Sequence, residues 1–257
     1  MGHDLWGLLL GLAAGLACGF LNTAASSGSA VSLPILMLLG LDPASANATN
    51  RIPVLIGATS ATLSFHRKKA LPWALALKVS APATLGSLAG AGLAELLSAR
   101  AMGLAITGAV LMALVLVFTK VKKAIEQASS DVARFGVREV AIFFAVGVWV
   151  GFIVLDGATY MLLALTLAVG LSLVQANAIK AAVAVPTTIM AMIVFAYRGD
   201  IDWTIGAILG AGSVLGGILG ARLTMAPRAK RYVFALLVIV ISGELVHLML
   251  HYVFRTH

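Results

Sequence analysis

The chain has 257 residues, of which 61% are hydrophobic and 11% are charged, and its formal net charge is +8. Soluble globular domains contain about 45–50% apolar and about 25% charged residues, so the composition excludes a soluble protein and indicates a membrane protein. The single cysteine, Cys18, excludes an intramolecular disulfide and a multi-cysteine metal site, and we expect no metal and no cofactor. The basic residues stand in short polar segments between apolar stretches. They therefore indicate membrane topology rather than nucleic-acid binding.

Apolar stretches recur along the whole chain, and at about 18 to 25 residues each is long enough to cross a hydrocarbon core. Their continuous hydrophobicity, without the two-residue alternation of a barrel strand, favours α-helices. The first stretch, 5–21, ends at a polar break over 22–29, and a short arm over 30–39 follows. At 1.5 Å per residue the arm covers about 15 Å, half a membrane. This length indicates a broken or re-entrant element, which is tolerated where it lines a cavity.

The remaining predicted elements have the same order in both halves. In the first half we expect helices at 44–66, 72–96 and 101–119, before a polar linker over 120–139. The second half has a helix at 140–155, a break at 156–159, a short arm to 169, and helices at 173–196, 203–225 and 231–253.

A shift of 130 residues superimposes the first half on the second. It pairs Gly40 with Gly170, Ala46-Asn47-Ala48 with Ala176-Asn177-Ala178, Phe65 with Phe195, Trp73 with Trp203, Gly86 with Gly216 and Gly90 with Gly220. The chain has only four tryptophans, so a gap-free register that also pairs asparagines and glycines indicates a duplicated unit. We divide the chain into a first transmembrane repeat (1–120), a cytoplasmic linker (121–139) and a second transmembrane repeat (140–257).

The charges of the loops predict how the two halves are oriented. Lysine and arginine accumulate in short cytoplasmic loops, so the basic loop 66–69 is predicted inside, whereas its acidic counterpart 197–202 is predicted outside. The next pair is reversed, with a single charge in 98–100 and a basic cluster in 227–231. These assignments agree when the halves have opposite orientations and both chain ends lie outside. The predicted fold is therefore all-α: a multi-pass protein of the inner (cytoplasmic) membrane with two inverted-topology repeats of about five helical segments, each opening on a broken element.

Inverted repeats with interrupted helices at matching positions are typical of secondary transporters, whose substrate site lies near the bilayer midplane between the repeats. The alternative is that the duplication reflects only how membrane folds grow, with the interruptions acting as packing kinks.

Motifs in both halves resemble one family of membrane transporters. They are Gly-Phe-Leu-Asn, Ser-Ser-Gly-Ser and Leu-Pro within 19–34, Ala-Asn-Ala-Thr-Asn-Arg at 46–51, Phe-His-Arg at 65–67, Ala-Asn-Ala-Ile-Lys at 176–180 and Ile-Asp-Trp at 201–203. Together they are similar to the sulfite exporter TauE/SafE family over nearly the whole chain. The resemblance implies permeation of a small, often sulfur-containing anion such as sulfite, thiosulfate, a sulfonate or sulfoacetate. The first break, Ser26-Ser27-Gly28-Ser29, departs from the glycine-rich turn that is frequent in the family.

Charged residues at membrane depth cost about 2.5–3.5 kcal/mol each on insertion scales and indicate function. Away from helix ends these are Arg51, Asp156, Lys180 and Glu244. Arg51 lies about 11 Å into a predicted helix that starts outside, and Lys180 lies about as far into the equivalent helix that starts inside. We expect both cations to flank the midplane and to hold an oxyanion through charge-assisted hydrogen bonds. The alternative is structural, with the two cations bound to backbone carbonyls or paired with Asp156 and Glu244.

Polar side chains near the two cations complete the predicted substrate site. Hydroxyl and amide groups donate hydrogen bonds to a partly dehydrated oxyanion, and the N-termini of the short arms add positive dipole ends. The predicted substrate-binding residues are Asn22, Ser26, Ser27, Ser29, Asn47, Thr49, Asn50, Arg51, Thr159, Asn177 and Lys180. The serines and asparagines are equally compatible with hydrogen bonding between helices. The pairs Gly86/Gly90 and Gly216/Gly220 have the spacing of helix-packing surfaces.

Three further residues are candidates for proton coupling: Asp156, Glu244 and His247. Asp156 stands at the second break, where it either carries a proton or caps the following arm. Glu244 and His247 share one face of the last predicted helix, and a structural ion pair or hydrogen bond is the favoured alternative there.

The predicted function is secondary transport of a small anion, a sulfur oxyanion or organosulfonate, by alternating access at a midplane site between the repeats. A membrane-embedded enzyme would need a nucleophile and base, or metal ligands, at one depth; no such motif occurs, so we expect no enzymatic activity. That enzyme and a passive anion channel are the alternatives. The expected partners are a small anion and the lipid bilayer. Export or uptake, proton-coupled or passive movement, and monomer or homodimer stay open.

Overall fold

A computed structural model describes residues 5–98, 101, 102, 104, 105, 108, 135–155 and 157–226. Within these residues every regular element is helical and no strand occurs. Most of the helix predicted at 101–119, the helix predicted at 231–253 and the proton-coupling candidates Asp156, Glu244 and His247 lie outside them.

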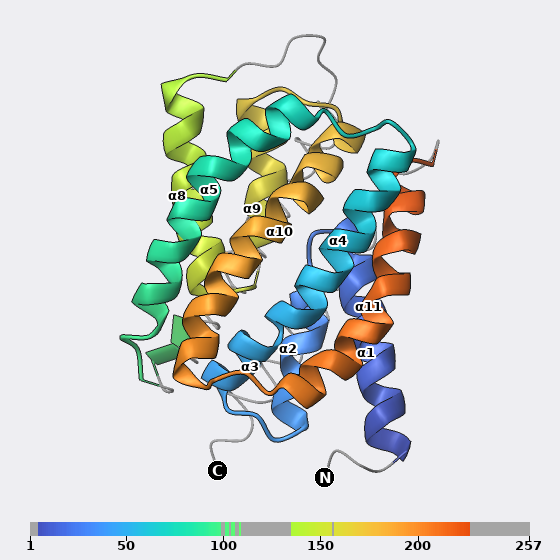
Figure 1. Ribbon diagram of the computed structural model, residues 1–257, viewed down its shortest axis with the longest axis vertical. Coiled ribbons are helices and arrows are strands. Elements are labelled where there is room, and N and C mark those ends of the chain that lie inside the picture. Colours follow the sequence, from blue (N-terminus) through green and yellow to red (C-terminus); the bar gives the residue numbers. More distant parts are fainter. Residues whose placement is uncertain are drawn as a thin grey trace.

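The two halves contribute helices in matching order (Figure 1). The first half provides α1 (Leu5–Ala24), α2 (Ser29–Leu38), α3 (Pro43–Thr49), α4 (Arg51–Arg67) and α5 (Trp73–Ala94). The second half provides α8 (Val137–Phe152), α9 (Gly157–Leu163), the π-helix η2 (Ala164–Ala168), α10 (Leu173–Arg198) and α11 (Trp203–Thr224). Among the described helices, α1, α5, α10 and α11 are long and apolar enough to span a membrane. The prediction of an all-α, multi-pass membrane protein is confirmed.

Each half begins with a helix that is interrupted by a short non-helical turn. α1 ends at Ala24 and α2 begins at Ser29, whereas α8 ends at Phe152 and α9 begins at Gly157. A break is therefore confirmed in each half, but the second lies earlier than predicted, because α8 already ends at Phe152 and residues 157–159 belong to α9. The first break is shorter than predicted, because Asn22 still belongs to the last turn of α1.

The helix predicted at 44–66 is two helices in the structure. α3 ends at Thr49 and α4 begins at Arg51, with Asn50 between them. Pro53 explains the junction, because proline has no N–H and its ring crowds the carbonyl four residues earlier, that of Thr49. Arg51 is consequently the first residue of α4, which corrects the prediction that it lies well inside a helix.

Local conformations recur at the 130-residue spacing. The recurring pairs are Gly40 and Gly170 (φ 99° and 86°), Lys69 and Gly199 (φ 56° and 81°), and the N-cap residues Asp42 and Ser172 of α3 and α10. Glycine adopts positive φ without steric cost, so Lys69 bears a cost that Gly199 avoids. The turns thus preserve the duplication where the side chains have diverged.

Glycines bring helices of the two halves into backbone contact. α5 packs along α8, and α11 packs along α1. An added Cβ at Gly90 would lie 1.9 Å from a backbone oxygen of α8, and one at Gly216 would lie 2.2 Å from a backbone oxygen of α1. Gly86 and Gly220 face the same two neighbours. The prediction that these four glycines form packing surfaces is confirmed.

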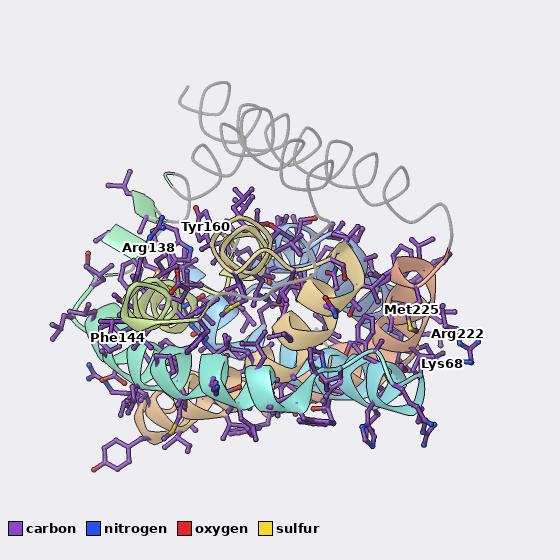
Figure 2. All side chains as sticks on the ribbon, turned by 90° about the horizontal axis from the view of Figure 1, so that it is seen from above. Lys68, Arg138, Phe144, Tyr160, Arg222 and Met225 are labelled. Atoms are coloured by element: carbon purple, nitrogen blue, oxygen red, sulfur yellow. The ribbon has the colours of Figure 1, made fainter. Side chains whose placement is uncertain are left out.

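Equivalent helices of the two halves run in opposite directions. In Figure 1, α1, α4 and α11 run upwards, whereas their counterparts α8, α10 and α5 run downwards. Figure 2 shows the molecule from above, at the end where α4 and α11 finish and α8 starts. Three exposed basic residues lie at this end: Lys68 directly after α4, Arg222 in the last turn of α11 and Arg138 in the first turn of α8. Three basic residues that the charge rule places inside therefore share one end of the bundle. The side of the membrane that this end faces stays a prediction.

Candidate functional site

A cavity of about 60 Å³ lies where α1, α4, α10 and the broken element α8–α9 meet. About 10–15 Å³ of such space holds one water molecule, so the cavity accommodates a few waters or a small ion. Its polar wall consists of Asn22, Thr23, Arg51, Lys180, Thr187 and Thr188, and its apolar wall includes Val54, Val150, Val154 and Met161. Both halves of the chain contribute to each wall.

Arg51 is fully buried at the first position of α4. Its Nη1 and Nη2 donate hydrogen bonds to the carbonyl oxygens of Val150 (2.9 Å) and Gly151 (2.6 Å), in the last turn of α8. Its guanidinium carbon lies 4.7 Å from the centre of the Phe195 ring on α10, a cation–π contact. Among the described residues, its buried Nε has no hydrogen-bond partner.

Lys180 is buried on α10 and reaches the first break. Its Nζ donates to the carbonyl oxygens of Asn22 (2.9 Å) and Thr23 (3.2 Å), to Ser26 Oγ (2.6 Å) and to Asn177 Oδ1 (2.7 Å). An ammonium group has three hydrogens, so these four acceptors use all of them.

The two cations stabilise the breaks reciprocally. The last carbonyls of a helix lack intrahelical partners and form the negative end of its dipole. Arg51 of the first half satisfies such carbonyls at the end of α8, and Lys180 of the second half satisfies them at the end of α1. The structural alternative, in which the cations bind backbone carbonyls, therefore describes their contacts. Neither cation forms an ion pair with a carboxylate within the described part of the chain.

Two more side chains of the predicted site link the breaks. Asn47 on α3 donates through Nδ2 to the carbonyl oxygen of Phe152 (3.2 Å) and accepts through Oδ1 from the N–H of Val154 (2.9 Å), so it spans the second break. Thr159 on α9 donates to the carbonyl oxygen of Ser26 (3.1 Å) in the first break. The two interruptions are thus in direct contact.

Side chains within the first half also hold the first break. Asn22 Oδ1 accepts from the N–H of Gly28 across the turn (3.0 Å). Ser32 on α2 donates to Asn50 Oδ1 (2.6 Å), which ties α2 to the junction between α3 and α4. Ser26 adopts φ of 61°, an uncommon conformation for a non-glycine residue.

The predicted site residues fall into several groups. Those that line the cavity are Asn22, Arg51 and Lys180. Those that hold the breaks or the cations from outside the cavity are Ser26, Asn47, Asn50, Thr159 and Asn177. The hydroxyls of Ser27 and Ser29 are buried without a described partner, and Thr49 accepts a hydrogen bond from the N–H of Asp202 (3.0 Å), which anchors the start of α11. Their roles in transport stay predictions.

Sequence reasoning missed three hydroxyl residues of the cavity wall: Thr23, Thr187 and Thr188. Thr187 and Thr188 follow Lys180 by seven and eight positions, a spacing that places residues on one face of a helix. Extending the helical face from Lys180 would have identified them. Thr23 directly follows Asn22, at the end of α1.

The described residues form a multi-pass helical membrane protein whose two halves line a small cavity with a mixed polar and apolar wall. The chain belongs to the Sulfite exporter TauE/SafE family, whose model matches residues 11–245. The predicted family is therefore confirmed, and the protein is a membrane transporter.

Relatives of the chain carry names of the same kind. The chain is 29% identical to "Probable membrane transporter protein ORF9" of a Sinorhizobium species, over 82% of this chain and 81% of the relative. It is 26% identical to a "Probable membrane transporter protein" of Haemophilus influenzae, over 88% and 87% of the two chains. It is also 26% identical to "Probable membrane transporter protein YfcA" of Escherichia coli K12, over 93% and 90%. No solved structure matches the chain. The prediction of a multi-pass membrane protein is confirmed, and an inner-membrane location is consistent with these relatives.

Proposed function

We propose that the protein transports a small anion, a sulfur oxyanion or organosulfonate, through the cavity between its halves. The observation that carries the proposal is that two buried cations line the cavity while no carboxylate occurs among the described residues of its wall. Charges interact more strongly in a low-dielectric interior than in water, so such a chamber favours an anion over a cation. The charge-assisted hydrogen bonds of an arginine suit the oxygens of a sulfonate or sulfite group.

The size and the mixed wall of the cavity support a small substrate. A volume of about 60 Å³ admits an anion of a few atoms, and the apolar side chains of Val54, Val150, Val154 and Met161 suit a short carbon chain beside the charged group. The sulfur chemistry of the substrate follows the name of the family to which the chain belongs.

The reciprocal arrangement of the halves supports alternating access. Each half supplies the cation that satisfies the broken helix of the other, and the two breaks meet beside the cavity. In transporters built from inverted repeats, one repeat rocks against the other around a fixed central site. We infer that such a movement opens the cavity to one side of the membrane at a time.

Counterflow in proteoliposomes tests the proposal. Vesicles loaded with unlabelled sulfite should accumulate external ³⁵S-sulfite, and thiosulfate or a small sulfonate should compete more effectively than sulfate or acetate. Arg51→Gln should raise the half-saturating sulfite concentration about tenfold or more, since hydrogen bonds to charged groups contribute about 1.5–3 kcal/mol. Lys78→Gln is the matched control, because Lys78 is an exposed cation on α5.

The outcomes separate the alternatives. Sulfite flux that internal sulfite does not accelerate would indicate a channel. An absence of flux for every anion tested, with monodisperse protein, would refute the proposed function.

A further inference from the structure

The two cations that line the cavity differ in the hydrogen-bond donors that they have left. Lys180 directs its three hydrogens to four acceptors of the first break and of α10 at 2.6–3.2 Å. An anion gains a hydrogen bond from Lys180 only by displacing one of them. Lys180 therefore contributes its charge to the cavity, while its hydrogen bonds maintain the break.

Arg51 retains donors that the fold does not use. A guanidinium has five N–H groups, and the two that bond described residues end on Val150 and Gly151. Its Nε is buried and has no partner among the described residues, yet Arg51 lines the cavity. A ligand that accepts from an uncommitted N–H group of Arg51 does not have to displace an existing partner, in contrast to a ligand at Lys180.

Two threonines of the wall have hydroxyls without a hydrogen bond to the described residues: Thr23, whose carbonyl oxygen accepts from Lys180, and, on α10, Thr188. Thr188 is 2% exposed. The adjacent Thr187 also lines the cavity, but its hydroxyl donates within α10 toward the carbonyl oxygens of Val183 (2.9 Å) and Ala184 (3.2 Å). Thr187 and Thr188 therefore line the same cavity with side chains of the same shape, and they differ in whether the hydroxyl is already hydrogen-bonded.

Thr188 and Arg51 line the same cavity, and contacts through α5 and α8 connect their neighbourhoods. Arg51 stacks on Phe195, which follows Lys180 on α10 by a distance of about 22 Å along the axis at 1.5 Å per residue. Thr188 lies between these two positions. Ser87 on α5 donates to the carbonyl oxygen of Thr187 (2.8 Å) and packs against Gly151, the residue that accepts from Arg51.

We propose that Arg51 and Thr188 together bind the oxygen atoms of the substrate anion and so determine that the transporter selects an oxyanion. This inference rests on the proposed function. The guanidinium donates through its free N–H groups, and the Thr188 hydroxyl donates to a second oxygen.

A pair of isosteric substitutions tests the assignment. Thr188→Val removes the free hydroxyl, whereas Thr187→Val removes one that is already bonded within α10, and both keep the β-branched shape. In sulfite counterflow, Thr188→Val should raise the half-saturating concentration about three- to tenfold, the loss expected for one hydrogen bond, and Thr188→Ser should restore it. Thr187→Val should raise the half-saturating concentration by a smaller factor than Thr188→Val, because the Thr187 hydroxyl already donates its hydrogen within α10.

Equal half-saturating concentrations for the two valine variants, with active unmodified protein, would overturn the assignment and leave the proposed function intact. An absence of sulfite transport by the unmodified protein would overturn both. If Thr188→Val is not monodisperse, Thr188→Ala replaces it in the comparison with Thr187→Ala.

Discussion

At the scale of single residues, the two buried cations differ in how many of their N–H groups are already hydrogen-bonded. A buried charge is tolerated only where hydrogen-bonding partners replace its hydration, and here those partners are mainly helix-terminal carbonyls. Lys180 directs all three of its N–H groups to such carbonyls and to two side-chain oxygens, whereas Arg51 has N–H groups without a partner among the described residues. We therefore expect Lys180 to matter first for stability and Arg51 first for substrate binding.

Replacing Lys180 tests this division. Lys180→Met keeps a similar length but leaves the carbonyl oxygens of Asn22 and Thr23 without their donor. Each unsatisfied buried group costs about 1–3 kcal/mol, so the thermal unfolding midpoint in detergent should fall clearly. Lys78→Met, at an exposed position of α5, provides the control. Equal midpoints for the two variants would show that the break does not depend on Lys180.

At the scale of elements, the two halves cap equivalent helices with different chemistry. Asp42 caps α3 with a carboxylate, and Ser172, 130 residues later, caps α10 with a hydroxyl. Partial burial raises the pKa of Asp42, but hydrogen bonds from the Ser45 hydroxyl and from the N–H groups of Ser45 and Ala44 outweigh it, so the pKa lies below its usual value. Only the cap of the first half therefore titrates.

The pH dependence of stability follows from this difference. Because folding lowers the pKa of Asp42, its contribution is complete above the unfolded-state pKa of about 3.9 and disappears as the pH falls through the lower folded-state value. Asp42→Ala should cost roughly 0.5–2 kcal/mol at neutral pH and progressively less below about pH 4. Ser172→Ala should lower stability by a similar amount without that pH dependence. Thermal unfolding between pH 3 and 7 measures both, and parallel profiles for the two variants would contradict the assignment.

At the scale of the whole molecule, neither half is complete alone. α1 packs along α11 and α8 along α5, and each broken helix ends on a cation of the other half. The antiparallel course of equivalent helices (Figure 1) is the arrangement that two inverted repeats would have. Cysteine labelling decides its orientation in the membrane.

In a Cys18→Ala background, Lys68→Cys and Asp200→Cys should react with an impermeant maleimide from opposite sides of the membrane. Lys68 follows the last residue of α4, whereas Asp200 belongs to the loop before α11. That loop contacts the other end of α4, because the N–H of Asp202 donates to Thr49; the 17 residues of α4 separate the two ends by about 25 Å at 1.5 Å per residue. Labelling of both cysteines from the same side would refute the inverted arrangement.

The sequence predicted features that depend on composition and local pattern. Long apolar stretches predicted most of the helices, and small-residue spacing predicted the packing surfaces of Gly86 and Gly216. Polar clusters predicted that each half contains a break, but they placed the second break a few residues too late. The pattern failed where a single residue acts through the backbone, as Pro53 does in separating α3 from α4. The pattern also could not distinguish Thr187 from Thr188. These adjacent residues differ only in whether the side-chain hydroxyl is hydrogen-bonded within α10, which the sequence does not show.

The reciprocal capping of the breaks also has a consequence during synthesis. Asn22 and Lys180 are separated by 158 residues of chain, and ribosomes add about 5–20 residues per second. The end of α1 therefore enters the membrane on the order of ten to thirty seconds before the lysine that satisfies it exists. Throughout that interval the first break needs water or an insertion factor to occupy its carbonyls, because bare carbonyls in hydrocarbon cost several kcal/mol each. We therefore expect the nascent first half to stay at the site of insertion until the second half arrives.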